Sequence, residues 1–190
     1  MGEEVITMAE IGASSYRRFL QGDQAALAEF ICQYSDGLVR FAYSFVRDSA
    51  AAEDVAAESI AILFTRAKKF PDEVRMRAYL YKVARTKAVD HLRRHKLEVP
   101  LEDVESVIGG GDPERDVLKK ERDEGIYRCM QALPDRYRQV LQLAYFDSFS
   151  NPQICAILGK NSKQVYNLLS RARSALKQEL QKEGITHEDV

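Results

Sequence analysis

A stretch near the end of the chain carries basic and amide side chains at helical spacing, with no acid among them. Residues 159–177 contain five Lys or Arg residues and no Asp or Glu. Such side chains bind phosphate oxygens and the edges of DNA bases, whereas a merely solvated helix face usually mixes both signs of charge. The side chains expected to point away from the apolar stripe of this stretch are Lys163, Gln164, Tyr166, Asn167 and Ser170. We interpret the stretch as a DNA-binding surface.

Two helices are needed to hold these side chains. Ser150 followed by Gln153 predicts a capped helix start, and the apolar stripe that follows ends at Gly159, a residue type that often terminates helices. Asn161 and Gln164 repeat the capping pattern and predict a second helix. Two helices joined by a short turn with Gly fit a helix–turn–helix, whose second helix enters the major groove. An ordinary helical hairpin has the same apolar spacing, but the acid-free charge favours DNA binding.

Charge is distributed unevenly along the 190 residues, although the net charge is only −1. Residues 75–96 hold eight bases and one acid, and residues 125–177 hold eight bases and two acids. Between these two blocks, residues 97–124 hold four bases and ten acids. This pattern predicts two nucleic-acid surfaces separated by an acidic segment.

The periodicity of apolar residues is helical nearly throughout, which predicts an all-α fold. We expect two helical domains: an N-terminal bundle of three to four helices in residues 1–96, and a C-terminal helix–turn–helix bundle of four short helices in residues 123–190. An acidic, flexible linker is expected at residues 97–122. The N-terminal helices are predicted at about 23–47, 51–69 and 75–95, with Ile31 among the core residues of the first, and Phe146 is predicted in the C-terminal core.

Several classes of protein are disfavoured by the composition. No apolar run approaches the length of a membrane span, and the acidic N-terminus differs from a signal peptide, so we expect a cytoplasmic protein without membrane insertion. Cys32, Cys129 and Cys155 are far apart and are interpreted as small core residues. His91 and His95 have a spacing that can hold zinc, but without further ligands they are interpreted as surface residues. We find no catalytic constellation and expect no metal, cofactor or enzymatic activity.

Three segments of the chain carry a family resemblance. The first is GDQAALAEFICQYSDGLVRFAYSFVRDSAAAEDVAAES, the second is RAYLYKVARTKAVDHLRRHK, and the third is ALPDRYRQVLQLAYFDSFSNPQICAILGKNSKQVYNLLSRARSALK. In this order and spacing they resemble the extracytoplasmic-function (ECF) sigma factors, the smallest class of bacterial RNA polymerase specificity subunits. The resemblance extends from about Tyr16 to Leu180.

The resemblance implies a role for each domain. In the family, the N-terminal domain binds the clamp helices of the core polymerase and opens the downstream promoter element. The C-terminal domain reads the upstream element, and the linker runs toward the catalytic cleft. Core polymerase, through its clamp helices and flap, and promoter DNA are therefore the implied partners, with an anti-sigma factor as a further candidate.

The same resemblance assigns candidate site residues by position. The residues implied to face the polymerase are Glu53, Asp54 and Glu58. Those implied to bind or melt the downstream element are Lys69, Phe70, Arg75, Arg77, Tyr79, Tyr81, Lys82, Arg85, Thr86 and Lys87. Those implied to bind the upstream element are Ser162, Lys163, Gln164, Asn167, Arg171 and Arg173.

Some of these residues also have a purely structural explanation. Glu53 and Asp54 suit the first turn of a helix, where carboxylates interact favourably with the helix dipole. Tyr79 and Tyr81 lie two residues apart on one helix and therefore face different ways, so one of them is expected in the core.

Two rival functions remain at this point. One is a conventional helix–turn–helix regulator with a helical N-terminal domain for sensing or dimerisation, which should bind duplex DNA alone as a dimer. The other is a helical adaptor that binds only proteins, which should show no salt-dependent DNA binding. A sigma factor should instead bind core polymerase and act as a monomer.

Overall fold

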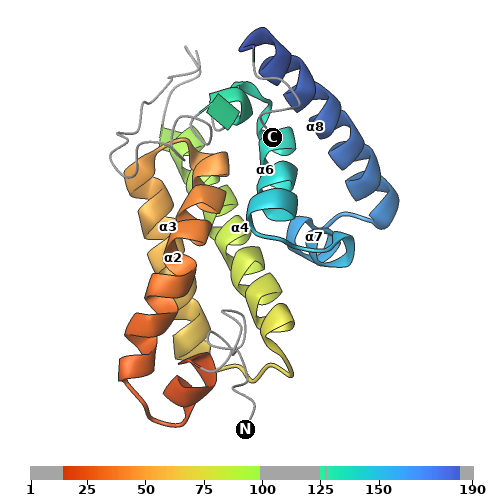
Figure 1. Ribbon diagram of the computed structural model, residues 1–190. Coiled ribbons are helices and arrows are strands. Elements are labelled where there is room, and N and C mark those ends of the chain that lie inside the picture. Colours follow the sequence, from red (N-terminus) through yellow and green to blue (C-terminus); the bar gives the residue numbers. More distant parts are fainter. Residues whose placement is uncertain (1–14, 99–124, 127, 185–190) are drawn as a thin grey trace, which may run out of the picture. The chain divides into compact units, whose positions relative to one another are not determined.

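The structure is a computed structural model that describes residues 15–98, 125–126 and 128–184. Within these residues every regular element is a helix, so the prediction of an all-α fold is confirmed (Figure 1). The chain divides into two compact units, Met1–Pro100 and Leu101–Val190. Most of the expected linker lies outside the described residues, and its acidic, flexible character stays a prediction.

The N-terminal unit contains a short helix at residues 15–20 and three long helices: α2 (Ala25–Val46), α3 (Ser49–Arg66) and α4 (Glu73–Glu98). Only two residues join α2 to α3. Arg47 has a left-handed backbone with φ of 59°, and the side chain of Asp48 accepts a hydrogen bond from Ala51 N at 2.7 Å. Such a short connection makes the two helices antiparallel neighbours.

The core of the N-terminal unit comes from all three long helices. Phe30, Leu38, Phe41, Leu63 and Leu80 are fully buried. Each buried side chain of this size contributes about 1.5–3 kcal/mol through removal of apolar surface from water.

Two residues expected in this core lie on the surface instead. Ile31 is 41% exposed, and Cys32 is exposed as well. Both follow Phe30, which is fully buried. Each step along a helix turns the side chain by about 100°, so the apolar face of α2 cannot include three consecutive residues.

The C-terminal unit begins with helical residues at 125–126 and 128–132 and continues with α6 (Asp135–Leu141), the π-helix η1 (Gln142–Phe146), α7 (Asn151–Leu158) and α8 (Ser162–Lys182). The expectation of four short helices is wrong for α8, which has 21 residues. Val140, Leu143, Ile154 and Val165 are fully buried and form the core of this unit with their apolar neighbours.

The π-helix changes which aromatic residue enters this core. Asp147 N donates to Gln142 O at 3.0 Å, a hydrogen bond that spans one residue more than in an α-helix. The wider turn leaves Phe146 47% exposed, whereas Phe149 is only 5% exposed. The prediction of Phe146 in the core is therefore wrong, and Phe149 takes that place.

A buried arginine links the first helical segment of the C-terminal unit to α6. Arg138 is 2% exposed, and its Nη1 donates to Gln131 O at 3.0 Å and to Gln131 Oε1 at 2.9 Å. Its Nη2 donates to Asp135 Oδ1 at 2.5 Å. A charge buried to this degree requires such partners, because removing one of them typically costs 3–5 kcal/mol.

We expect Phe149→Ala to lower the free energy of unfolding of the C-terminal unit by about 3–5 kcal/mol, because it removes a buried ring. Phe146→Ala, the matched control, should change it by less than about 0.5 kcal/mol. Urea unfolding of the full chain followed by circular dichroism measures both. Equal losses for the two variants would contradict the assignment of the core.

Candidate nucleic-acid interface

Helices α7 and α8 form the helix–turn–helix that the sequence predicts. Both predicted helix starts are confirmed, since capping boxes join Ser150 to Gln153 and Asn161 to Gln164. Gly159 ends α7 with φ of 63°, a left-handed backbone that favours glycine. The sequence thus determines the turn locally.

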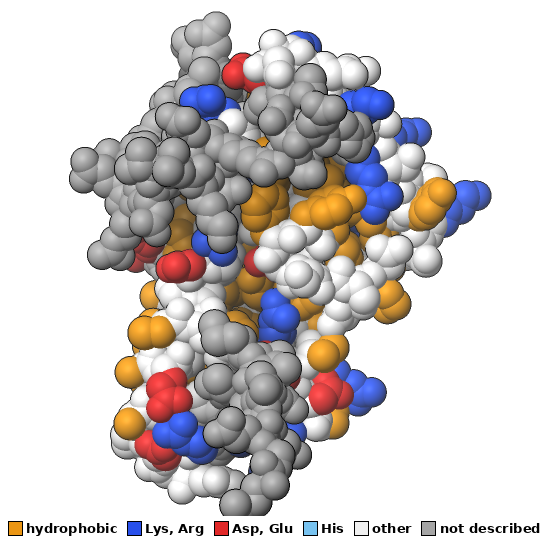
Figure 2. All heavy atoms as spheres, viewed as in Figure 1, with side chains coloured by type: hydrophobic (Ala, Val, Ile, Leu, Met, Phe, Trp, Pro, Cys, Tyr) orange, Lys and Arg blue, Asp and Glu red, His pale blue; other side chains and the backbone are white. Residues whose placement is uncertain are grey.

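One face of α8 packs inward and the other carries the predicted DNA-binding residues. Val165, Leu169 and Ala172 are buried. The predicted upstream-binding residues are all exposed, namely Ser162, Lys163, Gln164, Asn167, Arg171 and Arg173. Figure 2 shows Lys and Arg side chains recurring along the edge where α8 lies in Figure 1. This arrangement allows α8 to lie along an anionic groove.

Two of these six residues also hold contacts within the protein. Gln164 Oε1 accepts a hydrogen bond from Asn161 N at 3.0 Å, and Gln164 N donates to Asn161 Oδ1 at 2.9 Å, so only the side-chain nitrogen Nε2 of Gln164 lies outside the cap. Arg173 Nε donates to Tyr145 Oη at 2.6 Å, and the guanidinium carbon lies 5.7 Å from the centre of the Tyr145 ring. Arg173 therefore also anchors α8 to η1.

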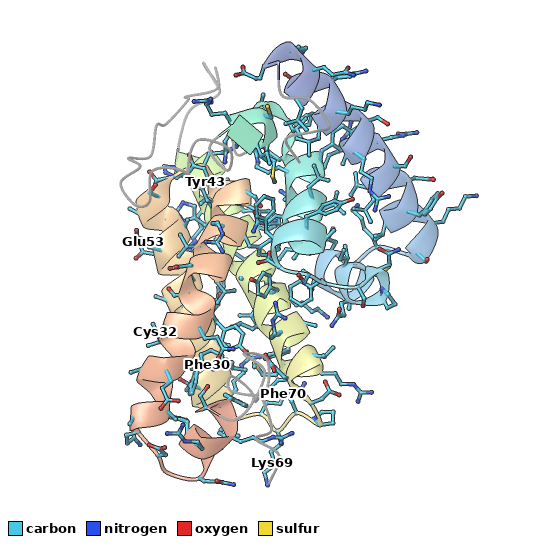
Figure 3. The ribbon with its side chains drawn as sticks, in the orientation of Figure 1. Phe30, Cys32, Tyr43, Glu53, Lys69 and Phe70 are labelled. Atoms are coloured by element: carbon cyan, nitrogen blue, oxygen red, sulfur yellow. The ribbon has the colours of Figure 1, made fainter. Side chains whose placement is uncertain are left out.

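In the N-terminal unit, the loop 67–72 between α3 and α4 carries an aromatic and basic cluster. The rings of Phe70 and Tyr79 lie 5.2 Å apart between centroids. Lys68 Nζ lies 5.5 Å from the Phe70 ring centre and 4.9 Å from that of Tyr79, and Arg66 Nη1 donates to Tyr79 Oη at 3.3 Å. Figure 3 shows Phe70 and Lys69 together at the end of the unit where α4 begins. Aromatic rings beside cations are suited to binding single-stranded nucleic acid.

The first turns of α4 continue this basic surface. Asp72 Oδ1 accepts from Arg75 N at 2.7 Å and caps the helix, and the Arg75 side chain is exposed. Lys69, Lys82 and Thr86 are exposed, whereas Arg77 and Arg85 are half-buried. Most of the predicted downstream-binding residues therefore lie on accessible surface.

Of the predicted downstream-binding residues, Tyr81 is buried and Lys87 forms an ion pair within the unit. Tyr81 is 2% exposed, with its ring 5.1 Å from that of Phe41, so it belongs to the core and does not present its ring to DNA. Tyr79 is the accessible member of the pair. Lys87 on α4 forms an ion pair with Glu58 on α3, so these two predicted site residues bind each other across the bundle.

Glu53 and Asp54 are exposed on α3. The helix begins at Ser49 with Asp48 as its N-cap, and its first turn contains no acid. The helix-dipole explanation for the two carboxylates therefore fails, because both lie beyond the first turn. Glu53 also lines a largely apolar groove of about 750 Å³ between α2 and α3, and Figure 3 shows it far from Phe70.

Sequence reasoning missed two residues of the Phe70 cluster, Tyr16 and Arg66. The Tyr16 ring lies 6.0 Å from that of Phe70, and burial raises the pKa of Tyr16 to about 12. The apolar spacing of Tyr16, Phe19 and Leu20 was a signal for the helix at residues 15–20. A cavity of about 310 Å³ lies between this helix and the loop, lined by residues that include Arg17, Phe70 and Glu73.

Among the described residues, no helix is both long and apolar enough to cross a bilayer. Within the same part of the chain, no group of three or more His, Cys, Asp or Glu side chains is placed to hold a metal ion.

Each of the two units matches a region of the same protein family. Residues 30–98 match the family model "Sigma-70 region 2", and residues 123–176 match "Sigma-70, region 4". The chain is 28% identical over 171 residues to the ECF RNA polymerase sigma factor SigW of Bacillus subtilis, covering 84% of this chain and 91% of that one. It is 27% identical over 175 residues to the RNA polymerase sigma-H factor of Pseudomonas aeruginosa, covering 86% and 91%.

Two solved structures share the fold. CnrH, in complex with the cytosolic domain of CnrY, has a TM-score of 0.60 and 20% identity, covering 90% of this chain and 98% of that one. RpoE of Bartonella quintana, in complex with the anti-sigma factor NepR, has a TM-score of 0.60 and 19% identity, covering 81% and 96%.

The N-terminal unit matches sigma-70 region 2 and the C-terminal unit matches region 4. The two matches together define a bacterial transcription initiation factor that binds DNA. The chain belongs to the sigma-70 family and is an RNA polymerase sigma factor of the ECF type. A conventional helix–turn–helix regulator is not favoured, because residues 30–98 match a sigma-70 region as well.

We expect Gln164→Glu to change the preferred upstream sequence. The variant keeps the oxygen that accepts from Asn161 N, but it loses the amide donor that could reach a base edge. Selection of bound sites from randomised upstream elements measures the preference. The same selected sequence for variant and wild type would exclude Gln164 from base recognition.

We expect Arg171→Ala to weaken binding to all upstream sequences alike and to reduce the salt slope of binding by about 1, because its exposed guanidinium is placed to contact phosphate. Titration of duplex DNA at several salt concentrations measures the slope. A selective loss for one sequence, or an unchanged slope, would contradict this role.

Proposed function

We propose that the two units of this sigma factor divide promoter recognition between them. In the N-terminal unit, the domain of residues 1–96 binds the clamp helices of the core polymerase and opens the downstream element. In the C-terminal unit, the domain of residues 123–190 binds the upstream element and the polymerase flap. The protein acts by binding, without a chemical step of its own, and its place of action is the cytoplasm, where bacterial transcription occurs.

The observation that carries this proposal is the cluster formed by Phe70, Tyr79 and Lys68. The ammonium of Lys68 lies within 5.5 Å of both ring centres, and Phe70 borders the cavity of about 310 Å³. Stacking of a base on an aromatic ring contributes roughly 1–3 kcal/mol, which is comparable to the cost of unstacking one base. The rings of the cluster can therefore stabilise one unpaired base of the non-template strand, while Lys68 lies close enough to contact the phosphate backbone of that strand.

Residues 162–177 of α8, which contain no acid, support the assignment of the upstream element to the C-terminal unit. Lys163 and Asn167 are exposed on the first two turns, from which a recognition helix reads base edges. Arg171 and Arg173 are exposed further along, where phosphate contacts set orientation.

The groove between α2 and α3 supports the assignment of the polymerase surface. It is lined mainly by apolar residues, including Ile31 and Ala57, with Glu53 among the few charged ones. Exposed apolar surface with charged neighbours is typical of protein interfaces. Glu58 is a weaker candidate than Glu53, because its carboxylate already pairs with Lys87.

An anti-sigma factor is proposed as a further partner. Of the two solved structures described above, one contains CnrH with the cytosolic domain of CnrY, and the other contains the sigma factor RpoE with the anti-sigma factor NepR. A partner of this kind would withhold the sigma factor from the polymerase.

We expect Phe70→Ala to transcribe poorly from a closed duplex promoter but nearly normally from a promoter that is pre-melted by mismatches. The change removes the ring that stacks on the unpaired base, and pre-melted DNA no longer requires that ring to compensate for unpairing. In vitro transcription with core polymerase measures the ratio of the two activities.

The alternative is that Phe70 mainly supports the fold. In that case Phe70→Ala would lower thermal stability by a few kcal/mol and impair both templates equally. Because the Phe70 side chain is only half-buried, we expect a small change in melting temperature.

We expect Glu53→Lys to weaken binding to core polymerase by about tenfold, because it places the opposite charge in the proposed interface. Asp54→Lys makes the same charge change at the next residue, which the resemblance also implies to face the polymerase but which does not line the groove. Affinity for core polymerase is measured with labelled protein. A larger loss for Glu53→Lys than for Asp54→Lys would support the groove as the interface, equal losses would show that the interface is not centred on the groove, and unchanged affinity for both would remove these acids from the interface.

A further inference from the structure

A short helix outside the part of the chain matched by sigma-70 region 2 contacts the loop that carries Phe70. This helix spans residues 15–20, whereas the match begins at residue 30. Tyr16 Oη donates to Lys68 O at 2.8 Å, and Arg17 Nη2 donates to Pro71 O at 3.2 Å. The two carbonyl groups flank Lys69 and Phe70, so the helix holds the loop on both sides of the proposed base-binding residue.

The Tyr16 ring is also part of the aromatic core beneath the loop. It is 3% exposed, and its centre lies 5.3 Å from that of Phe64 and 6.0 Å from that of Phe70. Its hydroxyl lies 3.4 Å from Leu63 O in the last turns of α3. One side chain therefore contacts the end of α3, a loop carbonyl and the Phe70 ring.

The short helix is fixed by a different residue. Arg18 Nη2 lies 2.6 Å from Asp23 Oδ2, and Arg18 Nη1 lies 2.8 Å from Glu29 Oε2 on α2. Arg18 thus connects the helix to α2, while Tyr16 and Arg17 donate hydrogen bonds to carbonyl groups of the loop. The loop is therefore hydrogen-bonded to a helix that is itself ion-paired with α2.

We propose that Tyr16, together with Arg17, is a positioning residue for promoter opening, which holds residues 68–71 in the conformation in which Phe70 receives an unstacked base. The inference rests on the proposed role of Phe70. An ordered loop binds its ligand without the entropic cost of ordering several residues on binding. The hydroxyl of Tyr16 is the critical group, because it donates to the carbonyl two residues before Phe70.

Tyr16→Phe tests the inference, because it keeps the buried ring and removes only the hydroxyl. We expect transcription from a closed duplex promoter to fall about threefold to tenfold, the effect of losing one ordinary hydrogen bond, with little change on a pre-melted promoter. In the free protein, hydrogen exchange of the backbone amides of residues 67–70 and 72 should become faster, Pro71 having no amide hydrogen. Unchanged exchange and an unchanged ratio of the two activities would overturn the inference.

Tyr34→Phe is a matched control. Tyr34 is also a buried tyrosine of the N-terminal unit, but its hydroxyl donates to the carboxylate of Glu73 at 2.5 Å and not to a loop carbonyl. We expect this variant to keep the wild-type ratio between the two templates. The same ratio defect in both variants would show that general destabilisation of the unit is the cause, and would overturn a specific role for Tyr16.

The double variant Tyr16→Phe with Phe70→Ala separates this inference from the proposed role of Phe70. If Tyr16 acts through Phe70, the double variant should lose no more duplex activity than Phe70→Ala alone. Additive losses, or a duplex defect in Phe70→Ala but none in Tyr16→Phe, would overturn the positioning role and leave the Phe70 role intact. If Phe70→Ala kept the same fraction of wild-type activity on the duplex and on the pre-melted promoter, neither Phe70 nor Tyr16 would have the proposed role.

Discussion

The packing of Phe64 against three other aromatic rings determines where the chain leaves the bundle of the N-terminal unit. Its ring centre lies 4.6 Å from that of Phe19, 4.9 Å from that of Phe30 and 5.3 Å from that of Tyr16. Because Phe64 belongs to the last turn of α3, this contact fixes the direction in which the loop 67–72 departs. The other end of the loop is fixed at the start of α4, where Asp72 Oδ1 accepts a hydrogen bond from Arg75 N at 2.7 Å. A loop fixed at both ends can present Phe70 in one place.

Binding of DNA also requires positive charge at the binding surface, although the net charge of the chain is −1. At physiological salt, charges more than about 8 Å apart are largely screened, so each basic face acts through its own side chains. The fold uses some bases internally, since Lys87 pairs with Glu58 and Arg138 with Asp135. Among the bases that stay exposed, Lys68 and Lys69 lie beside Phe70, and Lys163, Arg171 and Arg173 lie along α8, at the two surfaces proposed to bind DNA.

The sequence predicts well those features that neighbouring residues determine. The capping boxes and Gly159 define the helix–turn–helix within residues 150–164, and the structure contains it as predicted. The sequence predicts poorly those features that depend on contacts between residues far apart in the chain. The hydrogen bond from Tyr16 joins residues 52 positions apart, so nothing near Phe70 in the sequence indicates it. The exchange of Phe146 for Phe149 depends on one wide helical turn, which a fixed period of 3.6 residues cannot reveal.

Initiation from a promoter library by core polymerase, with and without this protein, tests the central claim most directly. We predict that the protein is required for a set of transcripts whose templates share two short elements at a constant spacing, one for each basic face. The protein should act as a monomer, and the transcripts should decline steeply as salt is raised. No dependence of transcription on the protein, combined with binding of a dimer to duplex DNA in the absence of polymerase, would contradict the account.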